Sequence, residues 1–65
     1  MDYIKKELVR ENKYYCEIAG TSLEDKPESG MITGSWFIEQ DTAKVYSWNA
    51  TTETWYLICE LGGGS

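Results

Sequence analysis

The acidic side chains of this chain are its first candidates for chemistry. Two pairs lie close together in the sequence, Glu39 with Asp41 and Glu24 with Asp25. A protonated and an ionised carboxyl group can act together as general acid and general base. Each pair, however, falls in a predicted turn or loop, where acidic residues are common because their oxygens accept bonds from nearby backbone amides. We therefore interpret both pairs as structural.

Other catalytic signatures are missing from the sequence. The 65 residues include no histidine, so the usual pairs of a serine or cysteine nucleophile with a histidine base are impossible. No glycine-rich loop stands between a predicted strand and a predicted helix, where a phosphate would bind. We expect a protein that is not an enzyme and that has no small-molecule substrate and no cofactor.

The two cysteines, Cys16 and Cys59, lie far apart in the sequence. Without histidine, they do not predict a zinc site. The first residues lack the apolar core of a signal peptide, which indicates synthesis in a reducing cytoplasm. Two buried free thiols are therefore the expected state, and a single disulfide is the alternative.

The charge balance narrows the range of partners. Eleven Asp and Glu against six Lys and Arg give a net charge of −5. This disfavours nucleic acid, which proteins bind with Lys and Arg, and it suits a basic partner. No apolar run approaches the ~20 residues of a membrane-spanning helix, so no membrane partner is predicted.

Strand-forming residue types dominate the chain, and the N-terminal part is the least certain. Residues 4–11 could form a short helix, because Ile4 and Leu8 are four positions apart. A two-residue turn at Asn12 and Lys13 favours a β-hairpin instead, with Val9 opposite Cys16 and Glu7 opposite Ile18.

A long irregular segment follows over residues 20–34 and contains the only proline. A loop of this length is uncommon in so small a domain and is often functional or packed on a partner. We expect Leu23, Met31 and Ile32 to anchor it to the sheet.

Three aromatic strands complete the predicted fold, at residues 35–40, 44–49 and 54–61, joined by turns at 41–44 and 50–53. The whole chain is thus expected to be a single small all-β domain over residues 1–61, an antiparallel sheet of about five short strands. Residues 62–65, Gly-Gly-Gly-Ser, predict a flexible tail, either the natural end or an added linker.

Alternation along these strands makes both sheet faces partly apolar. Trp36 and Ile38 lie on one face, and Phe37 and Glu39 lie on the other. We expect the hairpin and the long loop to cover one face. The Phe37 face, with Tyr46 or Trp48 and Tyr56 or Ile58, is expected to lack cover and to bind a partner. The predicted interface residues are Trp36, Phe37, Tyr46, Trp48, Trp55 and Tyr56.

Four runs of residues stand out in the sequence: Gly20-Thr-Ser-Leu-Glu-Asp-Lys-Pro-Glu-Ser, Thr33-Gly-Ser, Phe37-Ile-Glu-Gln-Asp-Thr-Ala-Lys-Val-Tyr and Thr54-Trp. These runs resemble small proteins that phages and prophages of Gram-positive bacteria encode. The meander is also similar to aromatic hairpin units of phage head-fibre and tail-fibre proteins. Ala43 departs from the glycine usual in that family's turn. A positive φ at Ala43 would strain the turn by about 1 kcal/mol.

The resemblance implies a virion-associated accessory protein and brings no catalytic residue. The expected function is that of a capsid-decorating or head- or tail-associated component, made in the host cytoplasm. It would bind a capsid protein, a tail protein or further copies of itself. One alternative is an acidic inhibitor of a host defence protein, which a continuous stripe of Glu24, Asp25, Glu28, Glu39 and Asp41 would favour. Another is a glycan-binding fibre module with aromatic stacking platforms.

Overall fold

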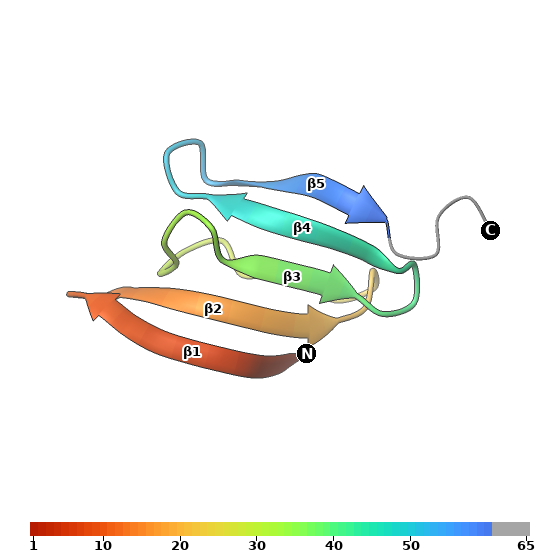
Figure 1. The fold of residues 1–65 in the computed structure, drawn as a ribbon, viewed down its shortest axis with the longest axis horizontal. Helices are drawn as coiled ribbons and strands as arrows, with labels where there is room; N and C mark the ends of the chain where they lie inside the picture. The colour runs from red at the N-terminus through yellow and green to blue at the C-terminus, as the bar shows by residue number, and fades with distance from the viewer. Residues whose placement is uncertain (61–65) are drawn as a thin grey trace.

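A computed structural model describes residues 1–60, which form one five-stranded sheet without a helix (Figure 1). The strands are β1 (Asp2–Arg10), β2 (Lys13–Gly20), β3 (Trp36–Glu39), β4 (Lys44–Asn49) and β5 (Thr54–Glu60). Their order in the sheet follows the sequence. The predicted all-β fold, a hairpin followed by a three-stranded meander, is therefore confirmed, but the sheet is mixed and not antiparallel throughout, because β2 and β3 are parallel. Residue 61 and the predicted tail at 62–65 lie outside the described residues.

The N-terminal residues form a strand, so the helical alternative is wrong. The predicted register is also wrong, because Cys16 pairs with Lys6 instead of Val9, and Arg10 pairs with Lys13 across the turn. Asn12 takes the last position of this turn with φ 59°, where the prediction placed it first. Two register irregularities, between Tyr3 and Lys5 and between Leu8 and Arg10, add to the shift.

The hairpin joins the meander edge to edge, and does not pack over it. β2 pairs in parallel with β3, and Ile18 lies opposite Phe37. Neighbouring parallel strands cannot be joined by a tight turn and need a crossover of about a dozen residues or more. Residues 21–35, which we call the crossover segment, provide it. The parallel pair thus explains the long irregular segment of the sequence.

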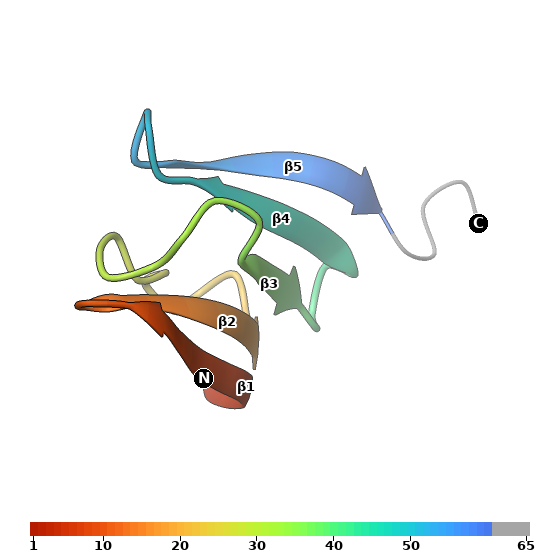
Figure 2. The ribbon, with the colours of Figure 1, turned by 60° about the vertical axis from the view of Figure 1, so that its left-hand side comes forward.

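The crossover segment runs over one face of the sheet, between its β1–β2 end and its β4–β5 end (Figure 2). Beneath it lies the core, in which Ile18 and Phe37 are fully buried. The other core side chains are Cys16, Met31 and Trp48. In Figure 2 the two ends of the sheet curve toward this segment. A chain this small therefore obtains a second layer from a loop.

All three antiparallel connections end on a residue with positive φ other than glycine. Asn12, Ala43 and Glu53 have φ of 59°, 59° and 53°, and each directly precedes the next strand. Asn adopts this conformation at little cost, whereas a residue such as Ala is strained by roughly 1 kcal/mol. The positive φ considered for Ala43 from the sequence is thus confirmed, and Glu53 adopts the same conformation.

Candidate functional site

The crossover segment is attached to the sheet by backbone bonds at one end. The Tyr14 N–H donates to the Gly30 carbonyl at 2.9 Å, and the Ile32 N–H donates to the Tyr14 carbonyl at 2.9 Å. Met31, held between them, is 3% exposed. Of the three predicted anchors, Met31 is buried and Ile32 is half-buried, but Leu23 is 93% exposed and anchors nothing.

A cation holds the middle of the segment. Lys26 Nζ forms an ion pair with Glu39 and lies 4.9 Å and 4.7 Å from the ring centroids of Phe37 and Tyr46. Glu39 is 4% exposed, and its second oxygen accepts a bond from the Thr42 hydroxyl at 2.7 Å. The Lys26 hydrogen bond is the main cause that lowers the pKa of Glu39. The buried carboxylate is therefore satisfied and ionised.

Trp55 of β5 binds the crossover segment through its indole ring. Its indole N–H donates to the Pro27 carbonyl at 2.9 Å. The ring packs edge-on against Phe37, with centroids 6.0 Å apart, and against Trp48 at 5.2 Å. Such aromatic pairs stabilise beyond their buried area by roughly 0.5–1.5 kcal/mol. Trp55 is therefore a packing residue with its polar atom satisfied.

Two further contacts hold the start of the segment. The Asp41 carboxylate accepts bonds from the Ser22 backbone N–H at 2.9 Å and from the Ser22 hydroxyl. These bonds lower the pKa of Asp41. The amino group of Met1 forms an ion pair with Glu24, which lowers the pKa of that carboxyl and raises the pKa of the amino group.

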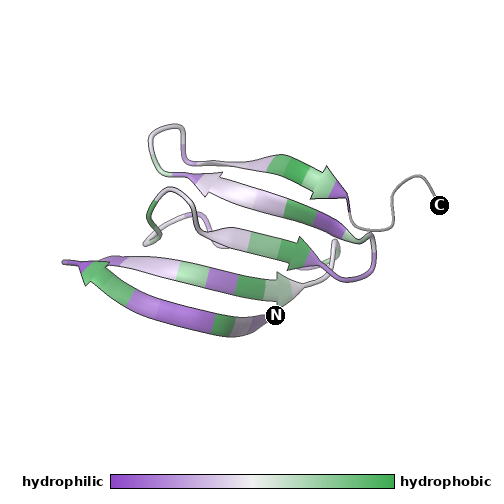
Figure 3. Cartoon of the chain, viewed as in Figure 1, coloured by the Kyte–Doolittle hydropathy of each residue, from purple (hydrophilic) through white to green (hydrophobic). Residues whose placement is uncertain are grey.

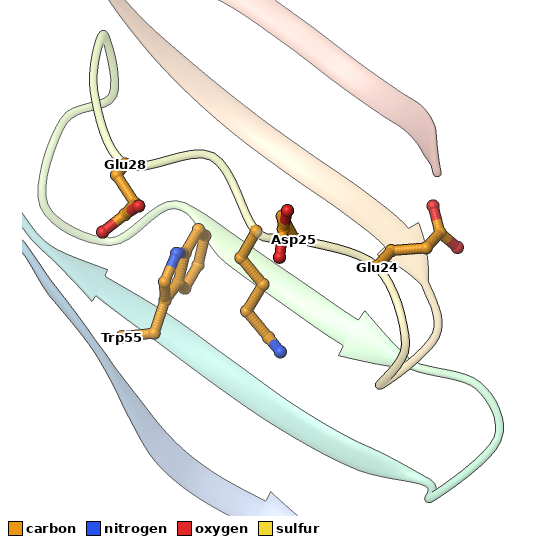
Figure 4. A pocket seen from close by; sticks show the side chains of 5 residues that line it. Glu24, Asp25, Glu28 and Trp55 are labelled. Atoms are coloured by element: carbon orange, nitrogen blue, oxygen red, sulfur yellow. The ribbon is translucent and has the colours of Figure 1, made fainter.

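A shallow hollow of about 500 Å³ opens beside these contacts. Glu24, Asp25, Lys26, Glu28 and Trp55 line it, and Figure 4 shows the carboxylates spread along the crossover segment with Trp55 beneath Glu28. Three acidic side chains therefore surround one hollow. Of the five carboxylates considered for an acidic stripe, these three line the hollow, whereas Glu39 is buried against Lys26 and Asp41 accepts bonds from Ser22.

The sequence pairs considered for acid–base work are not arranged for it. Glu39 is buried against Lys26, and Asp41 is occupied by Ser22. Glu24 is paired with the amino terminus. Within residues 1–60, no three side chains of the metal-binding types lie close enough together to hold a metal ion. The same residues contain no helix long and apolar enough to cross a membrane.

The second candidate surface is the opposite side of the sheet, which we call the open face. The register places Trp36, Ser47 and Tyr56 in one row across β3, β4 and β5, and Ile38 and Val45 in the next. Successive side chains alternate between faces, so this row points away from Phe37 and Trp48. The crossover contacts described above all lie on the Phe37 side. The open face therefore presents aromatic and aliphatic side chains that the crossover segment leaves uncovered.

The structure corrects the predicted choice of face. The Phe37 face, expected to lack cover, lies under the crossover segment. Of the six predicted interface residues, Phe37 and Trp48 are 0% and 2% exposed in the core, while Tyr46 and Trp55 are half-buried beside Lys26 and Pro27. Trp36, which is also half-buried, and Tyr56, which is 49% exposed, are the two that lie on the open face. The alternation within β3 was predicted correctly, but Tyr56, which was predicted as a candidate for the Phe37 face, lies on the opposite face with Trp36. Nothing in the sequence says which side a loop will cover.

Both cysteines are free thiols, so the disulfide alternative is wrong. Cys16 is buried in the core, and burial raises its pKa. Cys59 is exposed on β5, contrary to the expected burial of both. The two thiols lie on strands separated by β3 and β4, which explains why no bridge forms.

Comparison of the chain with protein families, with curated proteins and with solved structures finds no match. The acidic hollow and the open face are therefore the two candidate binding surfaces of the described residues.

Proposed function

We propose that this protein works by binding another protein through its open face. The observation that carries the proposal is the row of Trp36, Ser47 and Tyr56, flanked by Ile38 and Val45, on a side of the sheet that the crossover segment does not cover. Tyr56 is 49% exposed. Aromatic residues rimmed by polar ones are characteristic of interface centres.

The polar surroundings of the open face fit the same function. Tyr15 and Glu17 of β2 lie beside Trp36, and the Tyr15 hydroxyl donates to the Glu17 carboxylate at 2.8 Å. This bond raises the pKa of Tyr15. Lys5 and Glu7 form a further ion pair at the β1 end. An apolar centre with a charged rim can bury its middle in a partner while the rim stays hydrated.

For the biological setting we propose a phage virion, in which the protein decorates the capsid or associates with the head or tail. The support is the resemblance of residues 20–29, 33–35, 37–46 and 54–55 to small phage and prophage proteins. The partner would then be a capsid or tail protein, reached after synthesis in the host cytoplasm.

Mass spectrometry of purified particles tests this setting. We expect the protein at a fixed stoichiometry relative to the major capsid or tail protein. Its absence from particles, with normal expression in infected cells, would contradict the virion proposal and leave the protein-binding proposal to be tested against host proteins.

One observation favours a second candidate, an acidic inhibitor of a basic host protein. Glu24, Asp25 and Glu28 surround the hollow. Asp25→Asn combined with Glu28→Gln would abolish such inhibition, whereas a change on the open face would not. A glycan-binding module that stacks a sugar on Trp55 is not favoured, because the Trp55 ring is packed against Phe37 and Trp48 and its N–H is bonded to Pro27.

A further inference from the structure

β5 leaves one side of its backbone unpaired among the described residues. It ends the strand order and pairs only with β4, and Figure 1 shows it on the outer edge of the sheet. An edge strand presents a row of N–H and C=O groups that can pair with another strand.

The hydrogen bonds of Trp48 in β4 show which backbone N–H and C=O groups of β5 point outward. Its N–H donates to the Ser35 carbonyl at 2.7 Å, and its carbonyl accepts from the Gly34 N–H at 3.0 Å, so both groups face β3. Trp55 lies opposite Trp48 in β5 and therefore belongs to a pair without mutual hydrogen bonds. Since such pairs alternate with bonded ones, the backbone groups of Trp55 and Leu57 point out from the free edge.

The two edges of the sheet differ in their protection. β1 carries Lys5, Lys6 and Arg10 and two register irregularities, which are common defences against edge pairing. β5 carries no charge between Thr54 and Cys59, and its single irregularity lies beyond Leu57. Tyr56, Leu57 and Ile58 are 48–59% exposed. Figure 3 shows β1 with a hydrophilic middle between hydrophobic bands, whereas the C-terminal half of β5 is largely hydrophobic.

We propose that β5 pairs antiparallel with β5 of a second copy, around a two-fold axis at Tyr56. In this register Trp55 lies opposite the partner's Leu57, and Leu57 lies opposite the partner's Trp55. The outward groups of both residues then exchange hydrogen bonds in each direction. The pairing uses only the regular part of β5 and makes one continuous ten-stranded sheet from two five-stranded ones.

Charge makes a second copy a suitable occupant of this edge in spite of the net charge of −5. The paired stretch itself is uncharged. Glu53 precedes β5, and Glu60 lies beyond the irregularity, so neither belongs to the regular stretch that pairs. Like charges, which destabilise a sheet when directly opposite, are therefore kept apart. The pairing uses the edge and not the open face, so it does not rest on the proposed function.

Sedimentation equilibrium of the full chain, with proline and alanine variants, tests the pairing. We expect a species of twice 7.5 kDa for the natural sequence. Leu57→Pro removes an N–H that its own sheet does not use, and edge strands tolerate proline at such positions. It should weaken dimerisation at least about tenfold, while Leu57→Ala, which keeps the N–H, should remain dimeric. A natural protein that stays monomeric at all soluble concentrations would overturn the proposal.

A cross-linking experiment tests the register and does not depend on how proline is tolerated. Two residues facing across the axis in a pair without mutual hydrogen bonds have Cα atoms ~4.5 Å apart, within disulfide range. Tyr56→Cys with Cys59→Ser should form a covalent dimer on mild oxidation. Ile58→Cys in the same background is the control and should not, because its symmetry mate lies away from it. No dimer from either variant, or equal yields from both, would contradict the axis at Tyr56.

Discussion

At the scale of single residues, one contact of the crossover segment stabilises the fold, and a strained residue in the turn beside it destabilises the fold. Lys26 and Glu39 form a partly buried ion pair, in which Lys26 lies against the rings of Phe37 and Tyr46 and Glu39 accepts a bond from Thr42. Ala43, two positions after Asp41, stores backbone strain in the same turn. One of these features stabilises the fold and the other costs stability, so each can be tested by a single substitution.

Ala43→Gly should stabilise the protein by about 1 kcal/mol, because glycine adopts φ 59° without strain. Part of this gain is offset by the greater freedom of glycine in the unfolded chain. Urea denaturation followed by tryptophan fluorescence measures the change. Ala50→Gly, in the neighbouring turn at a position without positive φ, is the control and should destabilise, because it adds freedom to the unfolded chain and removes a methyl group packed against the core. Equal effects of the two substitutions would refute the strain at Ala43.

Glu39→Gln should destabilise the fold by about 2 kcal/mol, because it leaves Lys26 without its partner under the crossover segment. Replacing both Lys26 and Glu39 with methionine should recover most of the lost free energy of unfolding, since two apolar side chains leave no buried charge without a partner. Thermal denaturation of the single and double variants compares them. A double variant no more stable than Glu39→Gln would show that the pair itself contributes more than its desolvation costs.

The free energy of unfolding should depend on pH through the ionisation of the Glu39 carboxylate. The pKa of Glu39 is lowered from its ordinary value of 4.5, so the folded state binds its proton less readily than the unfolded state. Its contribution is full above pH 4.5 and is lost as pH falls through the lower folded pKa. Glu24 and Asp41 act in the same direction. Stability should therefore fall below about pH 4.5, and less steeply in Glu39→Gln. An unchanged slope would contradict the assignment.

At the scale of elements, the decisive contact is the parallel pairing of β2 with β3. It places Gly20 against the Phe37 ring, where an added Cβ would lie 2.7 Å from Phe37 Cζ. The requirement for glycine here comes from space and not from φ.

The three-stranded meander could be predicted from residue types and turn positions, because its pairs are local. The β2–β3 pair could not, since nothing in a single sequence specifies which distant strand lies beside another.

Gly20→Ala should destabilise the protein by about 1–3 kcal/mol, because Phe37 is fully buried and has no room to move. Phe37→Leu in the same chain removes the ring atoms that clash. The double variant should then be more stable than the sum of the two single effects predicts, and chemical denaturation of all four proteins measures this coupling. Strict additivity would contradict the close packing of β2 against β3.

At the scale of the whole molecule, a single sheet with one loop-covered face leaves its other face for a partner. The sequence predicts two apolar faces on a chain too short to cover both, and this part of the interpretation agrees with the structure. Which face lies under the loop depends on the crossover, which brings Lys26 and Pro27 over Phe37, Tyr46 and Trp55. Those contacts join residues far apart in sequence, so alternation alone selects the wrong face.

The central claim is that the open face binds a protein, and Ser47→Lys tests it most directly. Ser47 lies between Trp36 and Tyr56, so a lysine there puts a charge in the middle of the face without removing a core side chain. Ser29→Lys, on the exposed part of the crossover segment, is the matched control. The measurement is the amount of each tagged variant in purified particles, relative to the major structural protein. We expect Ser47→Lys to be reduced at least about tenfold and Ser29→Lys to match the natural protein. Equal incorporation of all three would contradict the claim.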